Sequence, residues 1–357
     1  MSHDAVKQPL LLDGAYRPEA PLNPVSLAVR EEAGGIAMAV MALAGGPAVG
    51  VGRMVRLWNG ADEDLGVFRV TRAMTETGRG GRLRLELEHC LACLCDCVLP
   101  YAVSVGTTVS AAVRTLLSSG GAPMTLASAG TDAAISRTGF VGVTVWEAVS
   151  TVLASLPEGW RLEVGGDGPP WDLRIAAAES APCVLSAGRS LISLNCEADL
   201  TDYCSRMYPI GKDGLTVRGV NGGDPWVRLT DSPAYGVASR MLSRPDVDSA
   251  AQLKTLALQE LARLSEPVLS VRAEARELYA ETGEDADRFT PGRLCVIPTD
   301  RLPGPWTGEL RCRVVTRSWP DLVRDPRRVV LTLGSRRPRL SAAVPAQKDW
   351  SRWRMYG

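Results

Sequence analysis

The chain has 357 residues, and its 40 lysines and arginines balance 40 aspartates and glutamates, so the formal net charge is zero. This balance gives no basic excess of the kind that nucleic-acid-binding proteins carry. A hydrophobic content of 45% and a charged content of 22% exclude wholesale disorder. A chain of this length exceeds what one hydrophobic core usually organises, so we expect two or three domains.

The N-terminal segment carries no sign of a secretory signal or a membrane anchor. Met1–Gln8 contains charged residues, and the apolar run Leu10–Leu12 is too short for a signal core. Ala33–Gly52 is uncharged, but it is rich in Ala and Gly and is interrupted at Gly45–Pro47, so it predicts strands and a loop. We therefore expect no membrane insertion by the chain itself. The nine cysteines fit free thiols in a reducing cytoplasm.

Residues 24–99 predict an all-β segment. Leu27–Glu31 alternates between apolar and polar residues, as a half-buried strand does. A glycine-led pattern of three strands follows, separated by polar loops. These strands are expected at Gly52–Leu57, Phe68–Arg72 and Arg82–Glu88.

Residues 105–179 predict a small α+β domain. Thr107 and Thr108 can cap a helix that Gly120 and Gly121 stop. A second helix is expected from Thr144, since Glu147 three residues later completes a capping box. A hairpin of two Trp-led strands should follow. Its strands are expected at Trp160–Val164 and Trp171–Ile175.

From Ser190 the sequence predicts extended chain again. Gly211–Gly214 reads as a turn with strands on both sides. A helix is expected from Ser249, with Pro267 beyond its end, and an alternating strand is expected over Leu269–Ala275.

A second glycine-led pattern of three strands repeats the first one near the other end of the chain. Its strands are expected at Gly292–Ile297, Cys312–Arg317 and Arg328–Leu333. The order and rough spacing agree with the first pattern, whereas the loop lengths differ. The duplication predicts a mainly β fold with an α+β insertion: two related, tube-like β-barrel domains plus a smaller inserted α+β domain. Two like barrels per chain would let a trimer present six similar units.

Four parts are expected on this basis. Residues 1–100 form the first β-barrel domain with an N-terminal arm, and residues 101–190 form the inserted domain. Residues 191–335 form the second β-barrel domain with a helical insertion. Residues 336–357 form a basic tail that carries Trp350, Trp353 and Tyr356, and we expect it to dock on a partner or a neighbouring subunit.

The run from His89 to Cys97 holds five potential soft-metal ligands in nine residues. Structural zinc sites usually draw ligand pairs from two separated segments, and no second pair follows here. If the run is helical, Cys90, Cys93 and Cys97 share a face, as they also would in a buried helix that uses cysteine as a small hydrophobe. Whether this run binds metal stays open, and we predict no metal site and no cofactor.

Catalytic motifs are absent from the sequence. It contains no His-Glu-x-x-His, no Gly-x-Ser-x-Gly and no phosphate-binding P-loop. A carboxylate pair for glycoside cleavage stays an alternative, but Asp62–Asp64 and Glu284–Asp285 read as solvated turn residues. We therefore predict no catalytic and no cofactor-binding residues.

Met207–Thr216, with its Tyr-Pro-Ile-Gly-Lys-Asp-Gly core, resembles the tail-hub proteins of bacteriophages. This family includes the prophage tail endopeptidases, the N-terminal part of siphophage tail-associated lysins and the baseplate hub of contractile tails. The surrounding order agrees over roughly residues 20–335: a β domain that closes near His89, an insertion with a helix start at Thr144–Glu147, and a late strand led by Pro291 and Gly292.

The resemblance implies a structural, non-enzymatic role at the distal tip of a virion tail, after assembly in the host cytoplasm. It implies a homotrimeric ring that adapts the six-fold tail tube or distal tail protein to three-fold tip components. The ring would continue the lumen, contact the C-terminus of the tape-measure protein, and carry a fibre, a needle or a receptor-binding protein. Longer family members carry lytic or fibre domains downstream of the position that Gly357 holds here, so peptidase activity is not expected. Two alternatives stay open: a cell-wall-degrading tail endopeptidase of the same family, and an unrelated multi-barrel binding protein.

Overall fold

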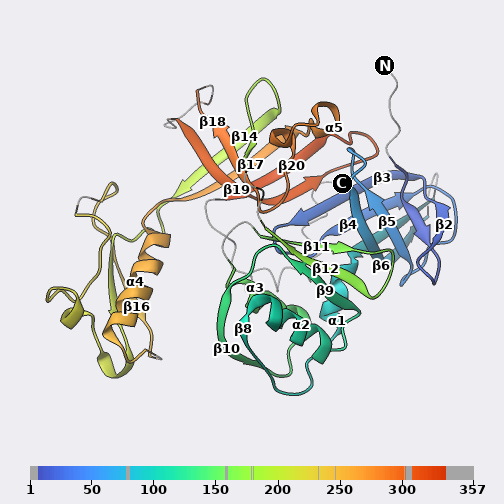
Figure 1. The fold of residues 1–357 in the computed structure, drawn as a ribbon. Helices are drawn as coiled ribbons and strands as arrows, with labels where there is room; N and C mark the ends of the chain where they lie inside the picture. Colours follow the sequence, from blue (N-terminus) through green and yellow to red (C-terminus); the bar gives the residue numbers. More distant parts are fainter. Residues whose placement is uncertain are drawn as a thin grey trace. The chain divides into compact units, whose positions relative to one another are not determined.

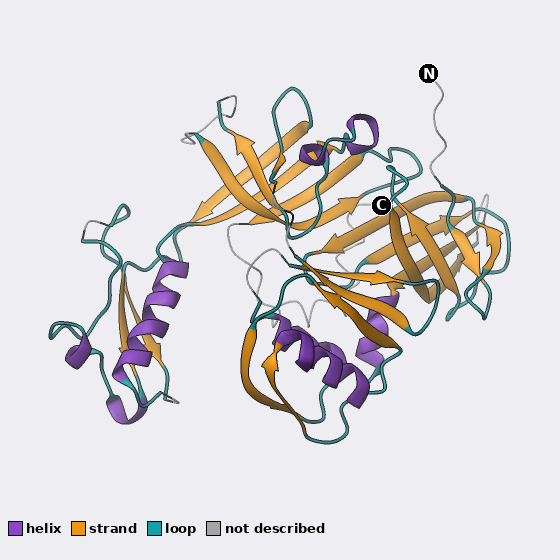
Figure 2. Cartoon of the chain, viewed as in Figure 1, coloured by secondary structure: helices purple, strands orange, loops and turns teal. Residues whose placement is uncertain are grey.

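The computed structural model describes residues 7–77, 81–156, 160–177, 179, 181–231, 233–245, 247–300, 302 and 308–334. The predicted tail at residues 336–357 lies outside this range, as do residues 1–6. The chain is mainly β with few helices, as predicted (Figure 2). It divides into two compact units, one formed by residues up to Leu194 with Arg272–Leu333, the other by Asn195–Val271 with a short segment after Leu333.

Five strands of the first repeat lie side by side in the order β3-β4-β7-β6-β5, each antiparallel to the next. Apolar side chains alternate inward along them, and this alternation fixes the register. β1 and β2 continue the sheet beyond β5. The bounds are β1 (Leu10–Leu12), β2 (Pro18–Pro21), β3 (Pro24–Glu32), β4 (Met38–Leu43), β5 (Met54–Trp58), β6 (Asp64–Glu76) and β7 (Arg82–His89).

The second repeat has the same strand order, β14-β17-β20-β19-β18. β13, which precedes β14 in the chain, pairs with the outer edge of β18, where β1 pairs with β5 in the first repeat. β19 joins the repeats by pairing with β3 (Figure 1). The bounds are β13 (Cys183–Val184), β14 (Leu191–Asp199), β17 (Val268–Arg276), β18 (Leu294–Pro298), β19 (Glu309–Trp319) and β20 (Arg328–Gly334), with α5 (Tyr279–Thr282) and η4 (Asp285–Asp287) between β17 and β18.

The repeats also share a detail of their hydrogen bonding. At the start of β5, the amide of Gly52 donates to the carbonyl of Val70 over 2.8 Å, and the Val70 amide donates to Arg53 over 2.8 Å. Before β18, the amide of Gly292 donates to Val314 over 2.7 Å, and Val314 donates to Arg293 over 2.9 Å. Both glycines have positive φ, +80° and +88°, which explains why glycine leads each pattern.

The inserted α+β domain lies between the repeats in the chain, and its buried core is continuous with side chains of the first repeat, among them Leu12 of β1 and Val67 of β6. The side chains of Thr108 and Thr144 cap α2 and α3, and Glu147 completes the predicted capping box. The Trp-led hairpin is β11 with β12, and β9 joins it in parallel. The bounds are η1 (Cys90–Ala92), α1 (Cys93–Asp96), β8 (Val103–Thr108), α2 (Val109–Ser119), β9 (Met124–Ala129), β10 (Ala134–Phe140), α3 (Val145–Leu153), β11 (Arg161–Gly165) and β12 (Trp171–Ala176).

The second unit is a small α+β body. Ser249 caps the predicted helix α4, whose apolar face packs on a two-stranded parallel sheet, β15 with β16. The strand predicted before Gly211–Gly214 is present as β15, but the strand predicted after this turn was wrong. η2 lies within the turn, the chain beyond it forms η3, and the partner of β15 comes from residues 239–243. The bounds are β15 (Arg206–Ile210), η2 (Lys212–Gly214), η3 (Arg218–Val220), β16 (Ser239–Ser243) and α4 (Ala250–Leu264).

The described strand pairs of the two repeats form one path that ends at β14 and at β2, without closing on itself. The two expected barrels are therefore seen as two equivalent parts of one open sheet. The four-part domain division stays a prediction. In the described part of the chain, no helix is long and apolar enough to cross a membrane.

Candidate functional site

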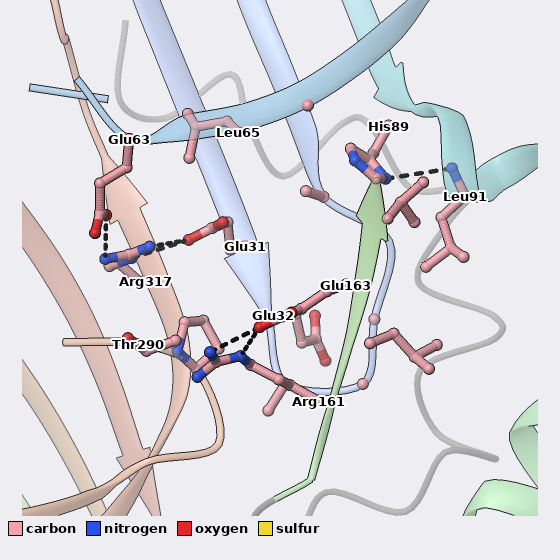
Figure 3. Close-up of a pocket in the computed structure, with 18 of the residues that line it drawn as sticks. Glu31, Glu32, Glu63, Leu65, His89, Leu91, Arg161, Glu163, Thr290 and Arg317 are labelled. Carbon is pink, nitrogen blue, oxygen red and sulfur yellow. Dashed lines mark hydrogen bonds and ion pairs between the residues drawn. The ribbon is translucent and has the colours of Figure 1, made fainter. Parts of the chain in front are cut away.

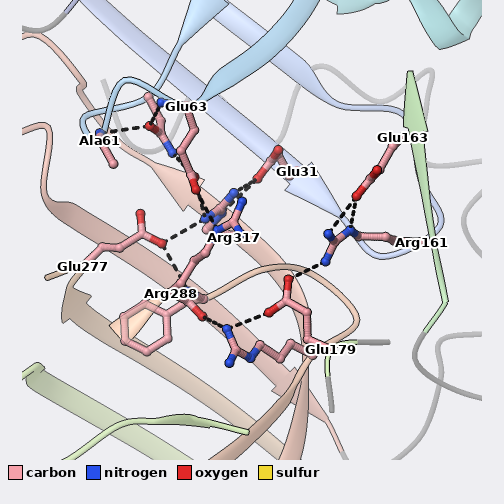
Figure 4. Close-up of polar contacts among 12 residues, drawn as sticks. Glu31, Ala61, Glu63, Arg161, Glu163, Glu179, Glu277, Arg288 and Arg317 are labelled. Atoms are coloured by element: carbon pink, nitrogen blue, oxygen red, sulfur yellow. Dashed lines mark hydrogen bonds and ion pairs between the residues drawn. The ribbon is translucent and has the colours of Figure 1, made fainter. Parts of the chain in front are cut away.

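Buried charged side chains lie at the joint between the two repeats, and Arg317 is at their centre. Arg317 lies in β19, directly opposite Glu31 of β3, and its side chain is only 4% exposed. Its guanidinium lies 2.7 Å from the carboxylate of Glu31 and donates a 2.9 Å hydrogen bond to Glu277; Glu63 is 4.0 Å away (Figure 4). We call these four residues the polar joint.

Burial of an arginine is tolerable here because acidic residues surround it. Burial by itself lowers the pKa of Arg317, but attraction to Glu31, Glu277 and Glu63 outweighs it and leaves the pKa above its ordinary value. The ring of Trp319 lies 4.4 Å from the guanidinium carbon and adds a cation–π contact. The polar joint therefore holds a permanent cation between segments that are far apart in the sequence.

Glu63 was predicted to be a solvated turn residue, and that prediction was wrong. Its side chain is 18% exposed and lies 2.6 Å from Nε of Arg288. Asn59, which is fully buried, donates to the same carboxylate over 2.6 Å. The turn thus presents Glu63 to cations of the second repeat, a pairing across more than two hundred residues that local sequence does not reveal.

A second charged cluster lies next to the polar joint. Arg293, with a side chain 1% exposed, pairs with Glu179 over 2.6 Å, and Arg161 lies between Glu179 and Glu163 at 2.5 and 2.7 Å. Burial raises the pKa of Glu179, but the hydrogen bond from Arg161 and the charge of Arg293 outweigh it, so the pKa lies below its ordinary value. The cluster connects the hairpin of the inserted domain to the start of β18.

A polar pocket of about 340 Å³ is lined by residues of both clusters, among them Arg317 and Arg161 (Figure 3). Its lining carboxylates have cationic neighbours: Glu31 and Glu63 as above, Glu163 with Arg161, and Asp64 with Arg56. Two of these ion pairs, Arg317 with Glu31 and Arg288 with Glu63, join the second repeat to the first.

His89 also lines the pocket. The backbone amide of Leu91 donates to Nδ1 of His89 over 3.2 Å, so the neutral ring carries its proton on Nε2. A Cβ at Gly66 would lie 2.5 Å from Nε2, and the ring of Phe68 packs edge-on at 5.3 Å. Burial lowers the pKa of His89 to about 4. His89 thus lies at the end of the first repeat as a neutral side chain that caps η1.

The cysteine run is split between two short helices and an extended residue. Cys90 lies in η1, Cys93 and Cys95 lie in α1, and Cys97 follows α1 in extended conformation, so the three cysteines of the expected face do not share one helix. Burial, and then the neighbouring Cys93, raise the pKa of Cys90 to about 12. Protonated thiols are poor metal ligands. Among the described residues, no group of three or more His, Cys, Asp or Glu could hold a metal ion.

Comparison with protein families shows a match in the second half of the chain. Residues 184–344 match the family model described as prophage endopeptidase tail. This segment contains the whole second repeat and the second unit. No curated protein sequence matches the chain.

Solved structures match nearly the whole chain. The tail protein from Neisseria meningitidis MC58 is 16% identical with a TM-score of 0.63, covering 92% of this chain and 96% of that one. The prophage tail protein gp18 from Listeria monocytogenes EGD-e is 11% identical with a TM-score of 0.62, covering 96% and 98%. The 43 kDa tail protein of prophage MuSo2 from Shewanella oneidensis is 12% identical with a TM-score of 0.64, covering 92% and 97%.

More distant matches extend the similarity to secretion machinery. The Escherichia coli c3393 protein, a component of the type VI secretion system, is 12% identical with a TM-score of 0.50, covering 92% of this chain and 76% of that one. These matches show the fold of phage tail proteins, and together with the family model they confirm the resemblance to the tail-hub family predicted from the sequence.

Proposed function

We propose that this chain is a structural tail-hub protein of a phage or phage-like particle and that three copies form a ring at the distal end of the tail. The observation that carries the proposal is the repeated strand order within one chain, joined at β3 and β19. Three such chains present six similar units to a six-fold tube while remaining three-fold toward the tip. The similarity in fold to phage tail proteins supports the same role.

The partners follow from this role. The ring would bind the tail tube or distal tail protein on one face and a fibre, needle or receptor-binding protein on the other, with the tape-measure protein in its lumen. One distant structural match comes from a PdpA–VgrG complex of Francisella, with a TM-score of 0.53. It supports partners of the tube and needle type.

The test of the proposed function is the native mass of the purified protein. We expect native mass spectrometry to give a species of three chains of 38.1 kDa each, and negative-stain images to show a ring. If the native mass is instead that of a stable dimer or a monomer, this result would contradict a self-assembling three-fold ring.

The description of the matched family favours a second candidate function, cleavage of the bacterial cell wall. Incubation of the protein with purified peptidoglycan separates the two, because a peptidase or glycosidase releases soluble fragments. For a structural hub we expect no release above that of a heat-denatured sample, and release above it would establish the enzyme.

A further inference from the structure

In the described part of the chain, β14 and β6 each leave part of a strand edge open in the sheet that contains the two repeats. β14 ends the path of paired strands. In the described part of the chain, one of its edges pairs with β17, and the other carries only an isolated bridge between Leu191 and Ala187. β6 is longer than its neighbour β5: residues 64–69 pair with β5, whereas Thr71–Glu76 pair only with β7 on the opposite edge. An open edge presents unpaired amides and carbonyls that a further strand can bind.

The corresponding place in the second repeat is filled. β19 is the counterpart of β6, and its first part, Glu309–Arg313, pairs with β18. Its remaining part, Thr316–Trp319, pairs antiparallel with β3. Because β14 is the counterpart of β3, the strand that would fill the open edge of β6 in the same way is β14. In one chain, however, β14 lies at the other end of the strand order.

We propose that β14 of one copy pairs antiparallel with Thr71–Glu76 of β6 in the next copy, so that the β3–β19 contact within the chain is repeated between chains. The partner is a second copy of this chain, and the proposal rests on the trimeric ring of the proposed function. Three such contacts between chains alternate with three contacts within chains and close the ring.

The sequences and the burial of the two strands agree with this pairing. Ile192-Ser193-Leu194 in β14 aligns with Val25-Ser26-Leu27 in β3. In β3, which is paired on both edges, every residue is buried or half-buried, whereas most of β14 is exposed, and Ile192 is 56% exposed. β14 thus has the apolar pattern of β3 but an open edge. These are the features expected of a strand that pairs with another copy on assembly.

The charges agree as well. The register within the chain places Thr316 opposite Glu32 and Trp319 opposite Val29. Carried over to the contact between chains, this register places Arg72 opposite Asp199 and Thr75 opposite Cys196. Opposite charges on facing strands favour the pairing.

Disulfide cross-linking in the full-length protein tests the pairing, because Cys196 is a native free thiol. β6 has a register shift between Val70 and Arg72, so cysteine is introduced in turn as Met74→Cys, Thr75→Cys and Glu76→Cys. Oxidation should link at least one of these variants into a three-chain species on a non-reducing gel, with the link to Cys196 identified by peptide mass spectrometry. Adding Cys196→Ser should abolish the link. Arg174→Cys, on an exposed position of β12, should form no such link and serves as the control.

The native mass of each variant, measured before oxidation, separates this proposal from the proposed function. A three-chain mass with no link from any of the three positions to Cys196 would overturn the strand pairing and leave the trimer standing. Absence of both the three-chain mass and the link would overturn both proposals. Linked ladders longer than three chains would contradict closure of the ring.

Discussion

Arg317 and Glu31 face each other across two paired strands although 286 residues separate them in the chain. Their ion pair, at 2.7 Å, ties the second repeat to the first. Removing Arg317 would leave the carboxylates of the polar joint without their central cation. We expect Arg317→Ala to lower the free energy of unfolding by about 3–5 kcal/mol, measured by urea denaturation.

A surface arginine provides the matched control for this substitution. Arg324 is 79% exposed and lies 3.5 Å from Asp321, so Arg324→Ala should cost at most about 1 kcal/mol. Arg317→Lys keeps the charge and should recover part of the loss. If Arg317→Ala costs no more than Arg324→Ala, the polar joint does not stabilise the fold.

The lowered pKa of Glu179 predicts how its contribution depends on pH. A carboxyl whose pKa is lower in the folded state stabilises the protein fully above its ordinary value, 4.5, and this contribution is lost as the pH falls through the folded-state value. Glu179→Gln should therefore be clearly less stable than the unsubstituted protein at pH 7, and the difference should shrink below pH 4.5. Glu284→Gln, in an exposed pair, is the control. A difference that stays constant from pH 7 to pH 3 would argue against an ionised Glu179.

His89 should act in a different pH window. Its folded-state pKa is about 4 against an ordinary value of 6.5, so the folded protein binds fewer protons than the unfolded chain between these values. Stability should fall as the pH decreases from about 6.5 to about 4, and His89→Phe should remove this decline. The sequence has one other histidine, so His3→Gln, which should retain the decline, is the control for thermal unfolding at each pH. A decline that survives in His89→Phe would assign it to other groups.

Gly52 and Gly292 hold equivalent positions with positive φ, and both should resist substitution. An alanine in this conformation costs about 1–2 kcal/mol because its Cβ approaches the carbonyl oxygen. Gly52→Ala and Gly292→Ala should each lower stability by this amount in chemical denaturation. Gly139→Ala, at a strand position with open space and no positive φ, should be nearly neutral. Unchanged stability of either variant would remove that glycine's backbone role.

Much of the fold could be predicted from local sequence. Thr108, Thr144 and Ser249 cap helices where the pattern of side-chain oxygens and apolar residues indicated them. The six strands of the two glycine-led patterns also formed where alternation predicted them, because one-sided burial imposes a period of two on the sequence itself.

The polar joint could not be predicted, because its ion pairs depend on strand register between distant segments. Arg317 lies in an alternating strand, where an arginine usually faces solvent. Its side chain is buried because β3, a strand from the other end of the chain, pairs with β19. The same reason explains Glu63, whose turn resembles any other acidic turn. The missing strand after Gly214 is a further case: β15 has a parallel partner from beyond residue 238, and parallel pairing leaves no turn signal between its strands.

The contact between β3 and β19 lies within one polypeptide, so its formation does not depend on protein concentration. The two repeats meet at an effective concentration set by the intervening chain. An assembly built from such double units forms half of its strand joints during folding and needs bimolecular encounters only for the other half. The two repeats also differ in their insertions. The first repeat has its insertion after β7, and the second has its insertion between β14 and β17. A ring of such chains would therefore carry two different insertions that alternate from one repeat to the next.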